Sequence, residues 1–232
     1  LKETLPYTQL KFTAFHLGNG AGGGVTRIIP YGRPKAEFIA KKMRVWSANK
    51  DHLSLSLLEK LTLENEFIQV VKSKILNTTN SDIAYLQLEN TRGQTLYSIL
   101  ADESVPTRVK NKLKKRYEQG MDQLITEAKK QGATIEEIQT SRGYYMSQKN
   151  ISPEALSAQP KVYEVRFPKL TRFFEDTETG KMLKNSTWKR MESKFPEVSK
   201  KLLESESQFN LLLKSDNVIV TPDYQLIVID PF

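Results

Sequence analysis

The stretch LKSDNVIVTPDYQLIVIDPF, Leu213–Phe232, contains two short apolar segments on either side of a turn. Val218–Val220 and Leu226–Ile229 are rich in β-branched residues, and the Pro-Asp pair between them is typical of a turn. This pattern predicts a β-hairpin. Because a hairpin brings its outer ends together, we expect Asn217 and Asp230 to lie at one mouth.

The expected mouth presents one amide and one carboxylate, from Asn217 and Asp230. Oxygen ligands of this kind suit a hard cation such as Mg²⁺ held against phosphate oxygens. The same pattern also fits a plain hairpin with polar residues at its entry and exit. The stretch alone therefore predicts either a magnesium site or a structural hairpin.

This stretch resembles two segments of the protein kinases. LKSDNVIV resembles the catalytic-loop segment around the metal-binding Asn, and IDPF resembles the strand end that carries the Asp of the Asp-Phe-Gly motif. Asn217 and Asp230 are 13 positions apart, as in ordinary kinases. The resemblance implies that both residues bind metal and that Lys214 neutralises the γ-phosphate of ATP.

Composition narrows the classes of protein. A chain of 232 residues can form one large domain or two small lobes. Its net charge of +8 suits acidic partners, such as nucleotide phosphates, nucleic acid, an acidic protein or a membrane surface, or simply a lysine-rich surface. The absence of Cys excludes disulfides and thiol catalysis, and two His residues argue against a His-based zinc site. No apolar run reaches the ~18 residues that a membrane span needs.

The beginning of the chain carries no recognisable signal peptide. It starts at Leu1 without Met, so we expect it to be a fragment, and the absence of a signal peptide here does not exclude targeting information elsewhere in the protein.

A glycine-rich stretch, LGNGAGGGV, follows an alternating segment over residues 7–17 that predicts a strand. Three of its glycines fit G-x-G-x-x-G, and glycine lets a backbone turn sharply and approach phosphates closely. The β-branched segment Thr26–Ile29 comes next, so the loop joins two strands instead of opening a helix. A flexible surface hairpin is the alternative. The kinase resemblance implies a flap over the phosphates, formed by Gly18, Asn19, Gly20, Ala21, Gly22, Gly23, Gly24 and Val25.

The segment Glu37–Trp46 predicts a strand, and its FIAK resembles the Val-Ala-Ile-Lys of the third kinase strand. The resemblance implies that Lys41 binds the α- and β-phosphates. Lys41 lies 16 positions after Val25, one more than usual, and a short turn at Gly32–Pro34 can absorb the difference. Lys42 is the alternative, because neighbours on a strand point to opposite faces. Either lysine could instead be an unpaired surface charge.

Apolar residues recur at helical spacing over residues 53–76, where Thr62 is placed to cap a second helical segment. Kinases carry at this point a helix whose Glu pairs with the strand Lys. Glu66 fits that position best, with Glu64 and Glu59 as alternatives. Each of the three would otherwise be a solvated helix charge.

The segment Ile83–Glu89 predicts a strand, and L-E-x-x-x-G-x-x-L resembles a kinase hinge followed by a helix. This resemblance implies that the backbone near Leu88 contacts adenine. Val109–Gln131 predicts a long amphipathic helix that is basic at its start. We interpret those basic residues as solvated surface and not as a nucleic-acid site, because aromatic residues are not interleaved with them.

Residues 132–180 form an insert that ordinary kinases lack before the catalytic loop. It contains one predicted strand, Val162–Phe167, and a turn at Glu175–Lys181, and it could dock a substrate or cover a missing lobe. Residues 182–208 are expected to be helical, with a break at Pro196. The predicted class is α+β, with an antiparallel-sheet N-lobe over residues 1–90 and a reduced helical C-lobe over residues 91–232.

Two departures separate the chain from ordinary kinases. Leu212 stands where a kinase carries the Asp that accepts the proton of the substrate hydroxyl, and leucine cannot accept a proton. Asp216 is nearby, but its adjacency to Asn217 implies the wrong direction. The second departure is the ending, because Pro231-Phe232 replaces Phe-Gly and the sequence stops at that point.

Reduced kinases of this kind resemble bacterial secreted effector kinases. That resemblance implies an atypical serine/threonine protein kinase that uses ATP and Mg²⁺, is secreted by a bacterium into the host cytoplasm as a virulence factor, and phosphorylates a host protein. The catalytic residues would be Lys41, Lys214 and Asp230. Two alternatives stay open: a pseudokinase scaffold that binds nucleotide without transfer, and a kinase-fold enzyme that transfers AMP or another group.

Overall fold

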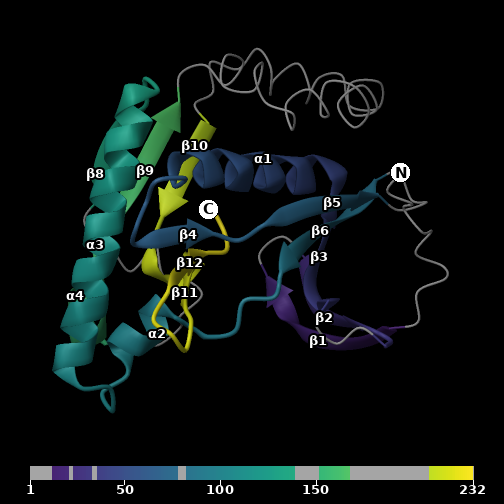
Figure 1. The fold of residues 1–232 in the computed structure, drawn as a ribbon, viewed down its shortest axis with the longest axis horizontal. Helices are drawn as coiled ribbons and strands as arrows, with labels where there is room; N and C mark the ends of the chain where they lie inside the picture. The colour runs from purple at the N-terminus through teal and green to yellow at the C-terminus, as the bar shows by residue number, and fades with distance from the viewer. Residues whose placement is uncertain are drawn as a thin grey trace. The chain divides into compact units, whose positions relative to one another are not determined.

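A computed structural model describes residues 12–20, 23–32, 36–77, 82–138, 152–167 and 209–231. These residues form a mixed α+β fold with four α-helices and several largely antiparallel sheets (Figure 1). The chain divides into two compact units. Unit 1 comprises Leu1–His52 with Lys72–Asn90, and unit 2 comprises Leu53–Val71 with Thr91–Phe232. The predicted α+β class with an antiparallel sheet is confirmed.

Unit 1 is built on a five-stranded antiparallel sheet. Its strands, in spatial order, are β1 (Phe12–Gly20), β2 (Gly23–Pro30), β3 (Phe38–Arg44), β6 (Ile83–Glu89) and β5 (Ser73–Asn77). The strand predicted at Ile83–Glu89 has the expected bounds, and the one predicted at 37–46 ends at Arg44 because a helix begins there. Phe38, Met43, Ala84 and Leu86 contribute to its buried residues.

Strands β1 and β2 form the glycine hairpin, and their pairing extends further than the sequence predicted. Pairing continues through Asn19↔Gly24 to Gly20↔Gly23, with an irregularity between His16 and Gly18. The expected strand end at residue 17 was therefore wrong, because the glycine backbone continues the ladder of hydrogen bonds. Ala21 and Gly22, at the tip, and part of the turn expected at 32–34 lie outside the described residues.

Helix α1 occupies Val45–Leu61, so the prediction of a helix over 53–76 was wrong at both ends. The helix ends where the Thr62 hydroxyl donates to the carbonyl of Leu58 at 2.9 Å. Asn65 then forms a turn, because its Oδ1 accepts hydrogen bonds from the N–H groups of Phe67 and Ile68. Two strands follow, β4 (Ile68–Val70) and β5, in a region rich in β-branched residues.

Unit 2 contains helix α3 (Thr107–Lys130), which confirms the long amphipathic helix predicted at 109–131. Its buried face includes Leu113, Tyr117, Met121 and Leu124, which join a cluster with residues of α1, β4 and α2 (Leu96–Ala101). Gly120 lets β4 approach this helix closely, because a Cβ there would lie 2.5 Å from Cγ1 of Ile68.

Unit 2 also contains two small sheets. One has the antiparallel order β10 (Phe209–Leu213), β9 (Val162–Phe167) and β8 (Thr134–Ile138). The other has the order β4, β12 (Leu226–Val228), β11 (Val218–Val220) and β7 (Gln94–Thr95), in which β4 and β12 are parallel. The predicted strand β9 has the expected bounds, whereas β8 and β10 were not predicted.

The short helix α4 (Pro153–Ala158) lies within the predicted insert, and Ser152 caps its first turn. The turn expected at 175–181 and the helices expected at 182–208 lie outside the described residues. In the part of the chain that the structure describes, no helix combines the length and apolar character needed to cross a membrane.

Candidate functional site

The first group of candidate residues lies in unit 1, around Lys41 on the central strand β3. Lys41 pairs across the sheet with Val25 of β2 and with Leu86 of β6. Residues directly opposite each other on neighbouring strands share a face, so Lys41 and Val25 lie on the same side of the sheet. Gly24 comes just before Val25. Lys41 therefore lies where the glycine hairpin joins the sheet.

Lys41 forms a buried ion pair with Asp51 of α1. Its Nζ lies 3.5 Å from Oδ2 of Asp51, and the two side chains are only 14% and 9% exposed. Lys42, the alternative lysine, is exposed and lies on the opposite face of β3. We call Lys41, Asp51 and the glycine hairpin the lysine cluster. The structure thus distinguishes Lys41 from its neighbour by a carboxylate partner.

Sequence reasoning missed Asp51 because it began the helix at residue 53. A start at Val45 would have placed Asp51 in the second turn, near enough in sequence to the strand lysine to be considered. The signal was the short distance along the chain between β3 and the first acidic residue after it.

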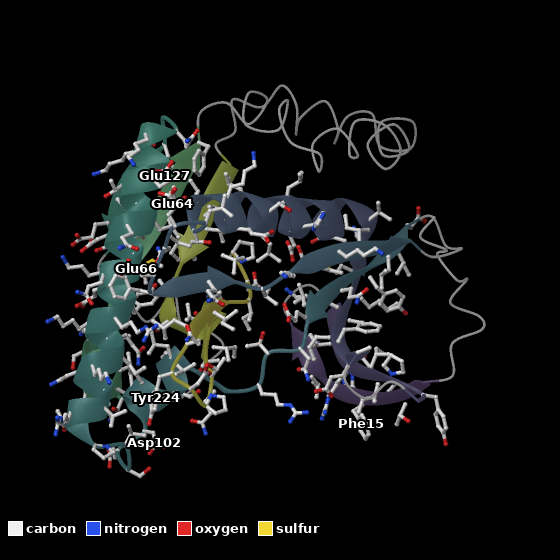
Figure 2. All side chains as sticks on the ribbon, in the orientation of Figure 1. Phe15, Glu64, Glu66, Asp102, Glu127 and Tyr224 are labelled. Carbon is white, nitrogen blue, oxygen red and sulfur yellow. The ribbon has the colours of Figure 1, made fainter. Side chains whose placement is uncertain are left out.

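The glutamates predicted to pair with Lys41 lie elsewhere. Glu66 is exposed and lies beyond α1, and its backbone N–H donates to Oε1 of Gln123 on α3. Glu64 is also exposed. The pKa of Lys130 on α3 is raised chiefly by its hydrogen bond to Glu127, and the charge of Glu64 adds a smaller contribution. Figure 2 shows both glutamates beside α3. The prediction that Glu66 is a helix residue was therefore wrong, and Glu59, although on α1, is exposed.

A hydrogen bond within unit 1 connects the middle of α1 to β5. Nδ1 of His52 lies 2.8 Å from Oγ of Ser73 on β5. Burial lowers the pKa of His52, which favours its neutral form. Because His52 follows Asp51 directly, this contact also limits the movement of the helix turn that carries the carboxylate.

Leu88, predicted to lie near adenine, is buried on β6 and pairs with Ile39 and Ser73 on the two neighbouring strands. Its backbone therefore belongs to the sheet ladder. The N–H of Glu89, the next residue, donates to the carbonyl of Lys72. The contact with adenine stays a prediction.

The second group of candidate residues lies in unit 2, at the C-terminal hairpin, and this hairpin is confirmed. Val218 pairs with Val228, and the N–H of Ile229 donates to the carbonyl of Asn217 at 2.9 Å. Asn217 supplies the acceptor of this bond and Asp230 follows its donor, so the two residues lie at the same end of the hairpin, as the sequence predicted. We call Lys214, Asp216, Asn217 and Asp230 the hairpin mouth.

A 3₁₀ turn over Ser215–Asn217 shapes the hairpin mouth. The N–H of Asn217 donates to the carbonyl of Lys214, and Nζ of Lys214 lies 3.5 Å from Oδ2 of Asp216. The Asp216 side chain is 11% exposed, and its Oδ1 is a buried atom without a hydrogen-bond partner among the described residues. The tight turn thus places the Asp216 carboxylate beside the ammonium of Lys214.

The electrostatics of Asp216 reflect these neighbours. Burial raises the pKa of its carboxyl, because desolvation penalises the charged form. The ammonium of Lys214 opposes that shift, and the negative charge of Asp230 adds to it. Asp216 therefore lies within electrostatic range of Asp230.

Leu212 occupies a structural position on β10. It pairs with Glu164 of β9, and its N–H donates to the carbonyl of Pro231 at 2.8 Å. Its half-buried side chain packs against the apolar cluster of Tyr97 and Val162. The position that a kinase would give to the proton-accepting Asp is here part of the packing of unit 2.

The donors at the hairpin mouth fit Mg²⁺. They are the amide oxygen of Asn217 and the carboxylates of Asp230 and Asp216, and hard oxygen atoms are the ligands that Mg²⁺ prefers. The buried Oδ1 of Asp216 adds an oxygen without a partner. Among the described residues, no group of three or more His, Cys, Asp and Glu side chains is placed to enclose a metal.

Comparison with known proteins adds no family. No protein-family model matches the chain, and no curated protein is similar to it in sequence.

Proposed function

We propose that this protein is an atypical kinase-like phosphotransferase that transfers the γ-phosphate of ATP to a Ser or Thr hydroxyl of a protein substrate, with Mg²⁺. The observation that carries the proposal is the buried pair of Lys41 and Asp51 next to the glycine hairpin. A lysine held by a carboxylate beside a glycine-rich hairpin is the arrangement that kinases use to bind the phosphates of ATP.

The lysine cluster would bind the phosphate chain. Backbone N–H groups of the glycine hairpin cover the phosphates, and glycine allows the close approach that this needs. Lys41 binds the α- and β-phosphates. Asp51 orients Lys41 and keeps its ammonium in place when the nucleotide is absent, since a buried lysine is costly without a partner.

In unit 2, the hairpin mouth would bind the metal ion. Asn217 and Asp230 would hold Mg²⁺, which neutralises charge on the β- and γ-phosphates. Lys214 binds the γ-phosphate, and Asp216 limits where its flexible side chain can go.

The reaction itself makes modest demands on a base. The hydroxyl oxygen attacks the γ-phosphorus, the bond from that phosphorus to the bridging oxygen breaks, ADP leaves, and the hydroxyl proton passes to solvent or to a carboxylate. Positioning and electrostatic stabilisation carry most of the catalysis in such loose transition states. A chain with Leu212 in place of the usual Asp can therefore still accelerate the transfer.

The test is phosphate transfer from γ-labelled ATP to a mixture of host proteins and to the chain itself. Lys41→Met and Asp230→Asn should each abolish transfer and weaken Mg-ATP binding in calorimetry, because each removes a charge that acts on the phosphates. Lys42→Met is the matched control for Lys41 and should retain activity. Equal activity in Lys41→Met and the unmodified chain would refute the proposal.

Intact-mass measurement after incubation with ATP distinguishes a kinase from a kinase-fold enzyme that transfers AMP. Addition of phosphate supports a kinase, whereas addition of AMP would replace γ-phosphate transfer with nucleotidyl transfer. Both reactions would still depend on Lys41 and Asp230.

A second candidate function is a scaffold that binds Mg-ATP without transferring phosphate. The position of Leu212 within β10 favours it, because no proton acceptor occupies that position. Thermal stabilisation by Mg-ATP, together with no transfer to any substrate tested, would support this function.

The identity of the substrate as a host protein, and secretion by a bacterium, rest on the resemblance to effector kinases. Expression of the chain and of the Lys41→Met variant in host cells, followed by phosphopeptide quantification, tests whether the substrate is a host protein. Phosphorylation sites that appear with the unmodified chain alone would identify the substrate.

A further inference from the structure

A buried hydrogen bond fixes the turn that carries the hairpin mouth. Oγ of Ser215 donates to Oε1 of Gln159 at 2.7 Å. The two residues are 56 positions apart in sequence, and they are 0% and 3% exposed. Ser215 lies between Lys214 and Asp216, so whatever holds Ser215 also constrains its two charged neighbours.

Both the nitrogen and the oxygen of the Gln159 amide form hydrogen bonds. Its Nε2 donates to the carbonyls of Tyr97 and Ala155, at 3.3 and 3.2 Å, while its Oε1 accepts from Ser215. A buried polar network in which every group has a partner is rigid, and loss of one member leaves the others without their bonds. Gln159 therefore joins α2, α4 and the 3₁₀ turn at one point.

Gln159 is itself held from a second side. It follows α4 directly, and Nζ of Lys114 on α3 lies 3.2 Å from the carbonyl of Ala158 and 3.4 Å from that of Gln159. Leu156 of α4 packs on the apolar cluster around Tyr97, which Leu212 also contacts. The segment around α4 is thus docked on unit 2 by polar and apolar contacts.

We propose that Gln159 and Ser215 are positioning residues for the hairpin mouth, and that the segment around α4 serves as a brace for the 3₁₀ turn. The brace sets where Lys214, Asp216 and Asn217 lie before any nucleotide binds. Its catalytic significance rests on the proposed phosphotransferase function, whereas the brace itself does not. Ordinary kinases have no insert at this point, so the brace gives residues 132–180 a task that the family resemblance does not assign.

The experiment compares Ser215→Ala and Gln159→Met with a matched control, Thr62→Val. Thr62 is also a buried hydroxyl residue of unit 2, but its Oγ1 donates to carbonyls of α1. Ser215→Ala removes one buried hydrogen bond, Gln159→Met removes three and should cost more stability, and Thr62→Val should cost about as much as Ser215→Ala. Only the first two should alter the turn.

Hydrogen–deuterium exchange of the ligand-free chain gives the decisive measurement. The N–H groups of Asn217 and Val218 are bonded within the turn, to the carbonyls of Lys214 and Ser215. In Ser215→Ala, we expect about tenfold faster exchange over residues 215–218, as expected for the loss of one buried hydrogen bond, and in Gln159→Met, which removes the same bond and two others, an increase at least as large. Exchange over residues 226–228 should not change, whereas that of Ile229, whose N–H donates to the carbonyl of Asn217, should follow the turn. In Thr62→Val, residues 215–218 should exchange as in the unmodified chain.

Kinetics then connect the brace to catalysis. We expect kcat to fall about tenfold in both variants while the KM for the protein substrate is unchanged, because the misplaced groups act on the γ-phosphate. If the unmodified chain transfers no phosphate but exchange rises as described, the brace stands and the proposed function fails. Unchanged exchange over 215–218, or an equal rise throughout unit 2, would overturn the inference whatever the activity.

Discussion

Replacing Asp51 by Asn removes the negative charge beside Lys41 with almost no change in side-chain size. The ammonium and carboxylate lie 3.5 Å apart, and the two side chains are 14% and 9% exposed, so solvent screens the pair only weakly. Coulomb's law with an effective dielectric constant of about 20 gives roughly 5 kcal/mol of attraction at this distance. The desolvation of both charges offsets part of this attraction.

The expected loss is larger than the net value of the pair, because the variant leaves Lys41 buried beside a neutral amide. Removal of one partner of a buried ion pair typically costs about 3–5 kcal/mol. We expect Asp51→Asn to lower the free energy of unfolding by about 3 kcal/mol. This value is at the lower end of that range because the amide of Asn still accepts one hydrogen bond. A double-mutant cycle with Lys41→Met should give a coupling energy of about 2 kcal/mol.

The assay is urea denaturation followed by circular dichroism, with Mg-ATP affinity measured in parallel. Asp51→Asn should weaken Mg-ATP binding about tenfold, because Lys41 loses the group that orients it toward the phosphates. Glu66→Gln is the matched control, since it neutralises the carboxylate that the sequence predicted as the partner. That exposed change should alter stability by no more than about 0.5 kcal/mol.

Two results would refute this reasoning. A coupling energy near zero between residues 41 and 51 would mean that the pair carries no free energy. Loss of Mg-ATP binding in Glu66→Gln but not in Asp51→Asn would return the orienting role to the glutamate.

Three further predictions concern stability. Burial lowers the pKa of His52 below its ordinary 6.5, so the unfolded chain binds a proton first as pH falls. Stability should therefore be lost as pH falls below 6.5, and His52→Gln should flatten that dependence in urea midpoints measured at several pH values. Gly93→Ala would place a Cβ 2.1 Å from the carbonyl oxygen of Val220 at a φ of +155°, and should cost about 3 kcal/mol or more. If this variant instead shows a melting temperature like that of the unmodified chain, β7 does not approach β11 as described. Gly120→Ala would press a methyl group against buried Ile68 and should cost about 1–2 kcal/mol after the gain in helix propensity. Combining it with Ile68→Ala should cost less than the sum of the two single changes, whereas strict additivity would contradict the contact.

The sequence by itself determined the parts of this protein that depend on local pattern. Val218–Val220 and Leu226–Val228 pair as predicted because β-branched residues flank a Pro-Asp turn, and this alone brings Asn217 and Asp230 to one mouth. The strand β6, the strand β9 and the helix α3 follow in the same way from hydrophobic period.

Only the tertiary structure decided which groups meet across long separations in sequence. The helix after β3 could not be delimited by period, because its apolar residues continue into β4 and β5, and so the carboxylate beside Lys41 was misplaced. The bond between Gln159 and Ser215 joins segments 56 positions apart, and no local signal announces it. Contacts of this kind depend on packing and on the need of buried polar groups for partners, and both become defined only when the whole chain has folded.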